Sequence, residues 1–237
     1  MESLSNAFAT ALALIASGDA ALLEIVLLSL RVSASAVALA CLIGMPLGTA
    51  VGALRFPGRA LLSILLNAAM SLPPVTIGLL VYLLVSANGP LGPLALLYTP
   101  TAMIIAQTLL VTPIVAALTR DVAATLHDDY REEFDSLGIS PGARIVALLI
   151  DGRFRLLTVA LAGFGRAIAE VGAVLIVGGN INHVTRVMTT TIALETSRGN
   201  LDLALALGIV LLLIALAVNI AVMATGRRAG TLAGGPT

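Results

Sequence analysis

Two charged residues of opposite sign, Arg166 and Glu170, lie four positions apart in a stretch that is otherwise apolar. Side chains at this spacing share one face of a helix, so the guanidinium and the carboxylate are expected to form an ion pair. Ionised groups are costly inside a membrane and usually face a bundle interior, a water-filled cavity or each other. Two interpretations stay open: the pair neutralises itself and holds the helix against a neighbour, or it lines or gates a conduit.

A second group of side chains offers hydroxyl donors suited to a tetrahedral oxyanion. They follow a Gly- and Asn-rich turn within residues 179–201, a segment that we expect to be a loop. β-Branched residues in a loop can equally be structural, so a binding role and a packing role both stay open. The residues concerned are Thr189, Thr190 and Thr191.

Two adjacent prolines, Pro73 and Pro74, predict a kink inside an apolar helix. Such a kink leaves carbonyl groups that a membrane helix must satisfy from its neighbours or from cavity water. The hydroxyl of Thr76 is close enough in sequence to serve there. The kink is either a packing feature or a hinge and polar spot along a pathway.

The composition places these groups in a membrane protein. Of the 237 residues, 59% are hydrophobic and 11% are charged, whereas a soluble domain carries about 25% charged residues. This balance excludes a soluble enzyme, a disordered protein and a disulfide scaffold. Thirteen basic residues offset thirteen acidic ones, so the net charge indicates no nucleic-acid partner. Every basic residue is Arg, and without the Lys of a P-loop the chain is not itself a Walker-type ATPase.

The apolar stretches predict an all-α integral membrane protein with about five spans. A span needs roughly 20 mostly apolar residues, and turn-forming Asn, Gly and Pro residues at 87–95 separate the second span from the third. Pro46 predicts a kink or break in the first. The expected spans cover about 20–53, 60–86, 96–118, 156–178 and 203–226.

The distribution of Arg residues predicts the orientation of the chain. The connections on one side carry only Arg186 and Arg198. The positive-inside rule therefore places the N-terminus outside and the C-terminus inside. The other side carries nine, namely Arg55, Arg59, Arg120, Arg131, Arg144, Arg153, Arg155, Arg227 and Arg228.

The longest polar stretch, 119–155, is expected to lie in the cytoplasm and to contain a helix of two or three turns. Asp128 or Asp129 is a suitable N-cap, and acidic residues then occupy the first turns. Gly138 is placed to end the helix, with a left-handed backbone or a close approach to a partner, and Pro141 follows as a stop signal.

Apolar residues recur along this helix at a spacing of four and three positions, at Tyr130, Phe134 and Leu137. The helix either packs on its own bundle or docks against a soluble partner, and the spacing alone does not decide between the two.

The segment from Glu132 to Gly138 resembles the EAA loop of permease subunits of ABC importers. In that family the loop is a coupling helix, which sits in a groove of a separate ATPase subunit. The present sequence departs from the family pattern at Glu133 and Phe134, where the family has Ala, and at Asp151, where it often has Pro. The resemblance implies that coupling to the ATPase involves Glu132, Glu133, Phe134, Leu137 and Gly138.

Two further stretches are similar to molybdate and tungstate permeases. One begins with Leu72-Pro-Pro-Val-Thr and continues to Asn88-Gly-Pro-Leu-Gly; the other runs from Gly163 through Val177-Gly-Gly-Asn-Ile181. The run Thr185-Arg-Val-Met-Thr-Thr-Thr-Ile-Ala-Leu-Glu195 looks most like the tungstate branch.

This resemblance implies a single permease domain over 1–237 in a prokaryotic inner membrane, paired with a second copy of itself and surrounded by lipid. An ATP-binding cassette ATPase and an external substrate-binding protein would be its partners, with no cofactor and no metal. The cargo would be tungstate, alternatively molybdate or sulfate. If the Arg166–Glu170 pair lines the conduit and does not only hold the helix against a neighbour, Arg166 attracts the dianion and Glu170 keeps it from binding too tightly to leave.

Two rival classes are disfavoured by what the sequence lacks. An intramembrane enzyme needs a nucleophile with a base or a metal cluster, yet His127 and His183 fall on loops expected at opposite sides. An independent secondary transporter usually shows internal symmetry between its halves, and none is visible here.

Overall fold

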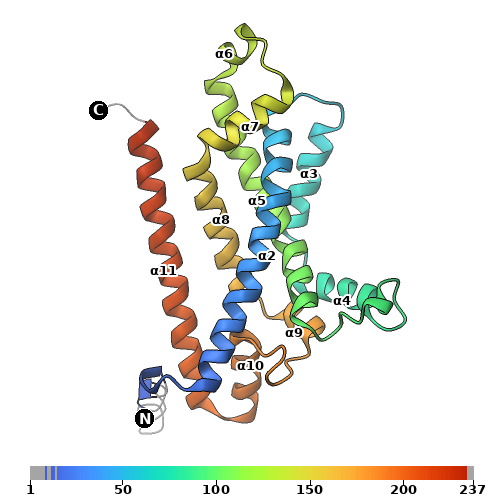
Figure 1. The fold of residues 1–237 in the computed structure, drawn as a ribbon, viewed down its shortest axis with the longest axis vertical. Coiled ribbons are helices and arrows are strands. Elements are labelled where there is room, and N and C mark those ends of the chain that lie inside the picture. The colour runs from blue at the N-terminus through green and yellow to red at the C-terminus, as the bar shows by residue number, and fades with distance from the viewer. Residues whose placement is uncertain (1–8, 10–11, 14, 234–237) are drawn as a thin grey trace. The chain divides into compact units, whose positions relative to one another are not determined.

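The computed structural model describes residues 9, 12–13 and 15–233, and every regular element in this part of the chain is a helix (Figure 1). The predicted all-α class is therefore confirmed for these residues. The elements are α2 Ala20–Ala53, α3 Arg59–Met70, α4 Pro74–Val85, the 3-10 helix η1 Gly92–Leu94, α5 Pro100–Asp129, α6 Arg131–Ser136, α7 Pro141–Asp151, α8 Arg153–Ile168, α9 Gly172–Gly178, α10 Met188–Arg198 and α11 Leu201–Ala233.

The chain forms two compact units, each made of three segments that are far apart in sequence. Unit 1 contains the beginning of α2, α4, the beginning of α5, α9, α10 and most of the apolar part of α11. Unit 2 contains the rest of α2, α3, the rest of α5, α6, α7 and α8. The segments are Met1–Ser35, Pro73–Gln107 and Arg166–Ala217 for unit 1, and Ala36–Leu72, Thr108–Gly165 and Val218–Thr237 for unit 2.

Three of the expected spans are continuous helices, and two are not. Helices at Ala20–Ala53, Pro100–Asp129 and Leu201–Ala221 are long and apolar enough to cross a membrane. The expected spans 60–86 and 156–178 are instead broken pairs, α3 with α4 and α8 with α9. By length and composition the described residues hold three candidate spans, or up to five if each pair counts as one.

The break between α3 and α4 lies where the two prolines predicted a kink, but it interrupts the helix. Ser71 closes α3 with bonds from its backbone N–H to Ala68 and Ala69, and α4 starts anew with Pro74 as its first residue. A proline has no N–H to give, so the first turn of a helix is the place where it costs least.

The first span matches its predicted bounds, and α2 continues through Pro46 without a break. In unit 2 its glycines Gly44, Gly48 and Gly52 face α5, where a Cβ at Gly48 would overlap the carbonyl oxygen of Ala116. Glycines four residues apart let two helix backbones approach closely. Arg59 completes this end of α2 by donating from Nε and Nη2 to the carbonyls of Val51 and Gly52.

Candidate functional site

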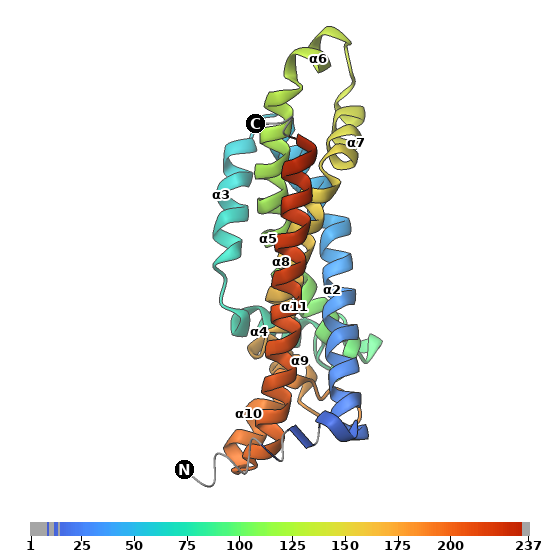
Figure 2. The ribbon, with the colours of Figure 1, turned by 90° about the vertical axis from the view of Figure 1, so that its left-hand side faces the viewer.

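The helix expected in the polar stretch 119–155 begins later and is shorter than predicted. α5 continues to Asp129, so Asp128 and Asp129 do not cap a new helix, and α6 begins only after Tyr130. α6 has six residues, fewer than the two or three turns expected. Figure 2 shows it at the end of α5, with the chain returning through α7.

Pro141, predicted to be a stop signal, is the first residue of the amphipathic helix α7. Ser140 is its N-cap, and the Ser140 hydroxyl accepts a hydrogen bond from the backbone N–H of Ala143 at 3.4 Å. Ser followed by Pro is a good start to a helix, because the Ser side chain satisfies a free N–H and Pro needs none. This helix was missed because the same Pro can mark either a stop or a start.

The candidate coupling residues do not all face the same way. Phe134 is buried, packed in a cluster with Ala53, Leu126 and Leu148. Leu137, three positions on, is 73% exposed, and the carboxylates of Glu132 and Glu133 are exposed as well. Phe134 therefore anchors α6 to unit 2, while the other side chains are free for a partner.

Gly138 has φ 61°, so the predicted left-handed backbone is confirmed. A Cβ at this position would meet nothing within 4 Å, so the backbone conformation, rather than lack of space inside unit 2, requires glycine here. The turn is closed by the Ile139 N–H, which donates to the carbonyl of Phe134 at 3.1 Å.

Arg144, which the sequence did not single out, holds this turn together. Its Nε donates to the carbonyl of Ile139 at 2.9 Å, and its Nη2 donates to the carbonyl of Phe134 and to Asp135 Oδ1. The guanidinium also lies over the Phe134 ring, 5.6 Å from its centroid. A lone Arg ten residues after Phe134 carries no local sequence signal for this role.

Asp151, which departs from the family pattern, also has a structural role. It accepts a hydrogen bond from Tyr130 Oη at 3.1 Å and so ties the end of α7 to the start of α6. This bond, together with the Asp151 charge, raises the pKa of Tyr130 above its usual value.

The second candidate region lies in unit 1, where Glu170 sits in the break between α8 and α9. Arg166 Nη1 donates to Glu170 Oε2 at 2.7 Å, which confirms the predicted ion pair. Glu170 is nevertheless not on the same helix as Arg166, because α8 ends at Ile168. Its other oxygen accepts from the N–H of Ala173, so the carboxylate also satisfies the start of α9.

Burial within the pair is unequal. The Glu170 side chain is 5% exposed and the Arg166 side chain 40% exposed. Buried charge must be paired and hydrogen-bonded, and Glu170 meets that requirement with both oxygens. Arg166 keeps part of its guanidinium open and is the member of the pair that can meet an anion.

The three threonines lie in helix α10 rather than in the expected loop. Thr189 Oγ1 donates to the carbonyl of Glu170, and Thr190 Oγ1 reaches Asn180 Oδ1 and the carbonyl of Val187. Thr191 Oγ1 likewise donates to the carbonyl of Val187. All three are buried, and their hydroxyl protons serve bonds inside unit 1.

Buried polar groups lie beside Glu170. Gln107 Nε2 donates to the carbonyl of Ala167 at 3.0 Å, whereas Gln107 Oε1 is buried without a hydrogen-bond partner in the described part of the chain. Gln107 and Glu170, with Thr189 and Ser33, line a small cavity with room for about one water molecule.

The proline site lies elsewhere in unit 1. Pro73 precedes α4, Pro74 is its first residue, and Thr76 is exposed. The N–H groups of Thr76 and Ile77 both donate to the carbonyl of Pro73, so the first turn of α4 satisfies this carbonyl. The Thr76 side chain lies at the surface of α4.

Comparison with known proteins relates the chain to transport proteins. A family model described as "Binding-protein-dependent transport system inner membrane component" matches residues 44–230. "Tungstate uptake system permease protein TupB" of Peptoclostridium acidaminophilum is 42% identical over 92% of this chain and 96% of its own length. The protein of the same name from Campylobacter jejuni is 35% identical over 92% of both chains. A "Probable anion ABC transporter permease protein" of Haloferax volcanii is 38% identical over 84% of this chain and 88% of its own.

Proposed function

We propose that the chain is the membrane-spanning subunit of an ATP-driven tungstate importer. The premise is that the chain belongs to the family of inner membrane components of binding-protein-dependent transport systems. As a member of this family the chain is a transport subunit of the inner membrane and not an enzyme. The observation that carries the choice of cargo is the 42% identity to a tungstate uptake permease over nearly the whole of both chains.

α6 supplies the coupling element in this proposal. Glu132, Glu133 and Leu137 are exposed, while Phe134 fixes the helix to unit 2 from the other side. A docked ATPase that moves α6 would move Phe134 with it, and through the Phe134 cluster the ends of α2, α5 and α7. A buried aromatic residue is well suited to this transfer because packed interiors do not deform continuously.

Arg166 is the residue of the proposed pathway that contacts the anion. Its guanidinium keeps its charge when partly buried, where a Lys could lose it. Glu170 offsets that charge, so a passing dianion meets an attraction weak enough to release it. Thr189 then serves the pathway by fixing the backbone at Glu170, and Thr190 by fixing Asn180 and the start of α10. Pro73, Pro74 and Thr76 serve it by shaping α4.

The remaining parts of the proposal concern the assembly. The chain acts as one permease domain, with the N-terminus outside and the C-terminus inside. It pairs with a second copy of itself, since a two-fold axis can hold a conduit that a few spans cannot enclose alone. An external binding protein delivers the anion, and two ATPase subunits dock at the α6 helices.

Uptake of isotopically labelled anions tests the proposal. A strain lacking the native system would receive this chain with its ATPase and its binding protein, and tungstate, molybdate and sulfate uptake would be compared. We expect tungstate uptake that requires the ATPase. Because the two metal oxyanions share charge and shape, we expect the preference to follow the binding protein when that subunit is exchanged. A preference that follows the permease would contradict the expectation that the binding protein selects the anion, and uptake of sulfate alone would contradict the assignment of tungstate as the cargo.

A further inference from the structure

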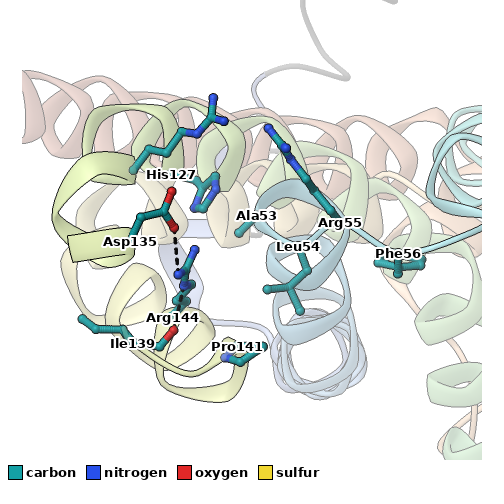
Figure 3. A pocket seen from close by; sticks show the side chains of 10 residues that line it. Ala53, Leu54, Arg55, Phe56, His127, Asp135, Ile139, Pro141 and Arg144 are labelled. Carbon is teal, nitrogen blue, oxygen red and sulfur yellow. Dashed lines mark hydrogen bonds and ion pairs between the residues drawn. The ribbon is translucent and has the colours of Figure 1, made fainter. Parts of the chain in front are cut away.

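A cavity of about 390 Å³ lies in unit 2, between the end of α2 and the helices α6 and α7 (Figure 3). Its charged lining comes from separate parts of the chain: Arg55 follows α2, His127 is near the end of α5, Arg131 begins α6, and Arg144 lies on α7. Asp135 is the only carboxylate among its lining residues. The proposed function leaves this cavity without a role.

The cations of the cavity exceed its anions. Arg144 is paired with Asp135 at 2.9 Å, as the dashed line in Figure 3 marks. Arg55 and Arg131 are exposed, and neither forms an ion pair within the described residues. Two guanidinium charges therefore remain uncompensated in the lining, a balance that suits an anion of one or two negative charges.

The fourth ionisable nitrogen base of the lining is His127. Nδ1 of His127 is buried and has no hydrogen-bond partner among the residues that the structure describes. Burial first, and then the charge of Arg144, lower the pKa of His127, so the ring is neutral at neutral pH. A neutral imidazole adds no charge to the lining, so the excess positive charge of the cavity comes from Arg55 and Arg131.

The size and the apolar lining decide which anion fits. A water molecule takes about 30 Å³ in the liquid. A bare tetrahedral oxyanion is only a few times larger and would leave most of the cavity unfilled. Leu54, Phe56 and Ile139 line the rest of the cavity, and Phe56 is 38% exposed. An anionic group joined to an apolar body matches this lining better than a free ion.

We propose that the cavity binds the phosphate group of an anionic phospholipid, with Arg55 and Arg131 as its charged ligands and Phe56 against the apolar part. The inference rests on the proposed orientation, which puts the end of α2 at the cytoplasmic leaflet, where anionic lipids gather next to basic residues. The bound lipid would join the end of α2 to α6 and α7 and so hold the coupling segment in place.

The first experiment counts bound lipid on the full-length chain and needs no transport. Native mass spectrometry of the detergent-solubilised protein would compare phosphatidylglycerol with phosphatidylcholine. We expect selective retention of phosphatidylglycerol, and roughly 30-fold weaker binding after the combined changes Arg55→Gln and Arg131→Gln. Arg153→Gln is the matched control, because Arg153 is an exposed cation of the same unit outside the cavity. Equal retention of both lipids, or equal loss in the control, would overturn the proposal.

The second experiment separates the lipid from other anions. The transporter complex in nanodiscs should show higher transport-linked ATP hydrolysis with phosphatidylglycerol than with phosphatidylcholine alone, and the double variant should lose that difference. If inorganic phosphate restores the rate in phosphatidylcholine, with tungstate and the binding protein present in every sample, the ligand is a free oxyanion and the lipid proposal is wrong. If the double variant loses the ATPase subunit in every lipid, the two arginines bind a partner carboxylate and the proposal is equally wrong.

Discussion

α6 and the break around Glu170 each place acidic residues in a largely apolar chain, yet they leave them in opposite states. Glu132 and Glu133 are exposed and form no ion pair in the described part of the chain. Glu170 is 4% exposed, and both of its oxygens are bonded. An exposed charge costs little and stays available to a partner, whereas a buried charge must first be satisfied and so serves the fold.

The glycines of the two regions differ in the same way. Gly138 is required by its left-handed φ in open space. Gly78 has no such φ, but a Cβ there would lie 2.7 Å from Cα of Ala173, where α4 packs on α9. One glycine serves backbone conformation at an exposed turn, and the other serves close packing beside the buried carboxylate.

The largest expected effect is at Glu170. Glu170→Ala leaves Arg166 without its partner and frees the N–H of Ala173, so we expect a loss of about 3 kcal/mol in the free energy of unfolding. Glu170→Gln keeps the acceptor and should cost less. Glu133→Ala, an exposed carboxylate, should stay within about 0.5 kcal/mol. Denaturant unfolding of the purified variants measures all three, and an equal loss at Glu133 would remove the contrast.

Gly78→Ala tests close packing. The added methyl group must push the backbone of α9, which we expect to cost about 1–3 kcal/mol. Gly208→Ala is the matched control, because Gly208 is also helical and in unit 1, and its added Cβ would meet nothing within 4 Å. Thermal unfolding of both variants in detergent gives the comparison, and equal midpoints would show that α4 and α9 can separate at no cost.

Gly138→Val tests the open turn and should cost about 1–2 kcal/mol of local strain, because the left-handed region is unfavourable for a β-branched residue. Membrane insertion should survive, while co-purification of the ATPase and transport-linked hydrolysis should fall. Gly138→Asn should retain more activity, since Asn tolerates this conformation. Full transport by Gly138→Val would mean that this turn is not the docking element.

Thr190→Val should have the smallest effect, a loss of about 1 kcal/mol, since it removes hydrogen bonds but keeps the shape of the side chain. Thr196→Val, on the exposed part of the same helix, is the control. If Thr190→Val instead left stability unchanged and lowered anion uptake, the hydroxyl would contact the cargo directly.

The sequence predicted the structure correctly where a single local property, such as apolarity, charge spacing or a glycine, determines it. Long apolar runs located α2 and α5, the spacing of Arg166 and Glu170 gave their ion pair, and Gly138 gave the left-handed turn. These signals are local, so a single sequence contains them.

The prediction failed where a residue has two possible roles or a distant partner. A Pro after Gly138 predicts a helix stop at Pro141, although with Ser140 this residue starts α7. The Gly- and Asn-rich turn before the threonines predicts a loop, yet Thr190 and Thr191 lie in α10 and bond back to its N-cap, Val187. The bonds of Arg144 to the α6 turn depend on the fold and have no signal in the sequence.

Thiol cross-linking at Leu137 tests the central claim, that exposed α6 is the surface coupled to the ATPase. The chain has one cysteine, Cys41, so Cys41→Ser with Leu137→Cys gives a single thiol on α6. Val146→Cys on α7, also exposed, is the control position. In the assembled complex we expect a short bifunctional reagent to cross-link position 137 to the ATPase, with a yield that changes when ATP is added. We expect no cross-link between position 146 and the ATPase. Cross-linking at position 146 and none at position 137, with or without ATP, would contradict the account.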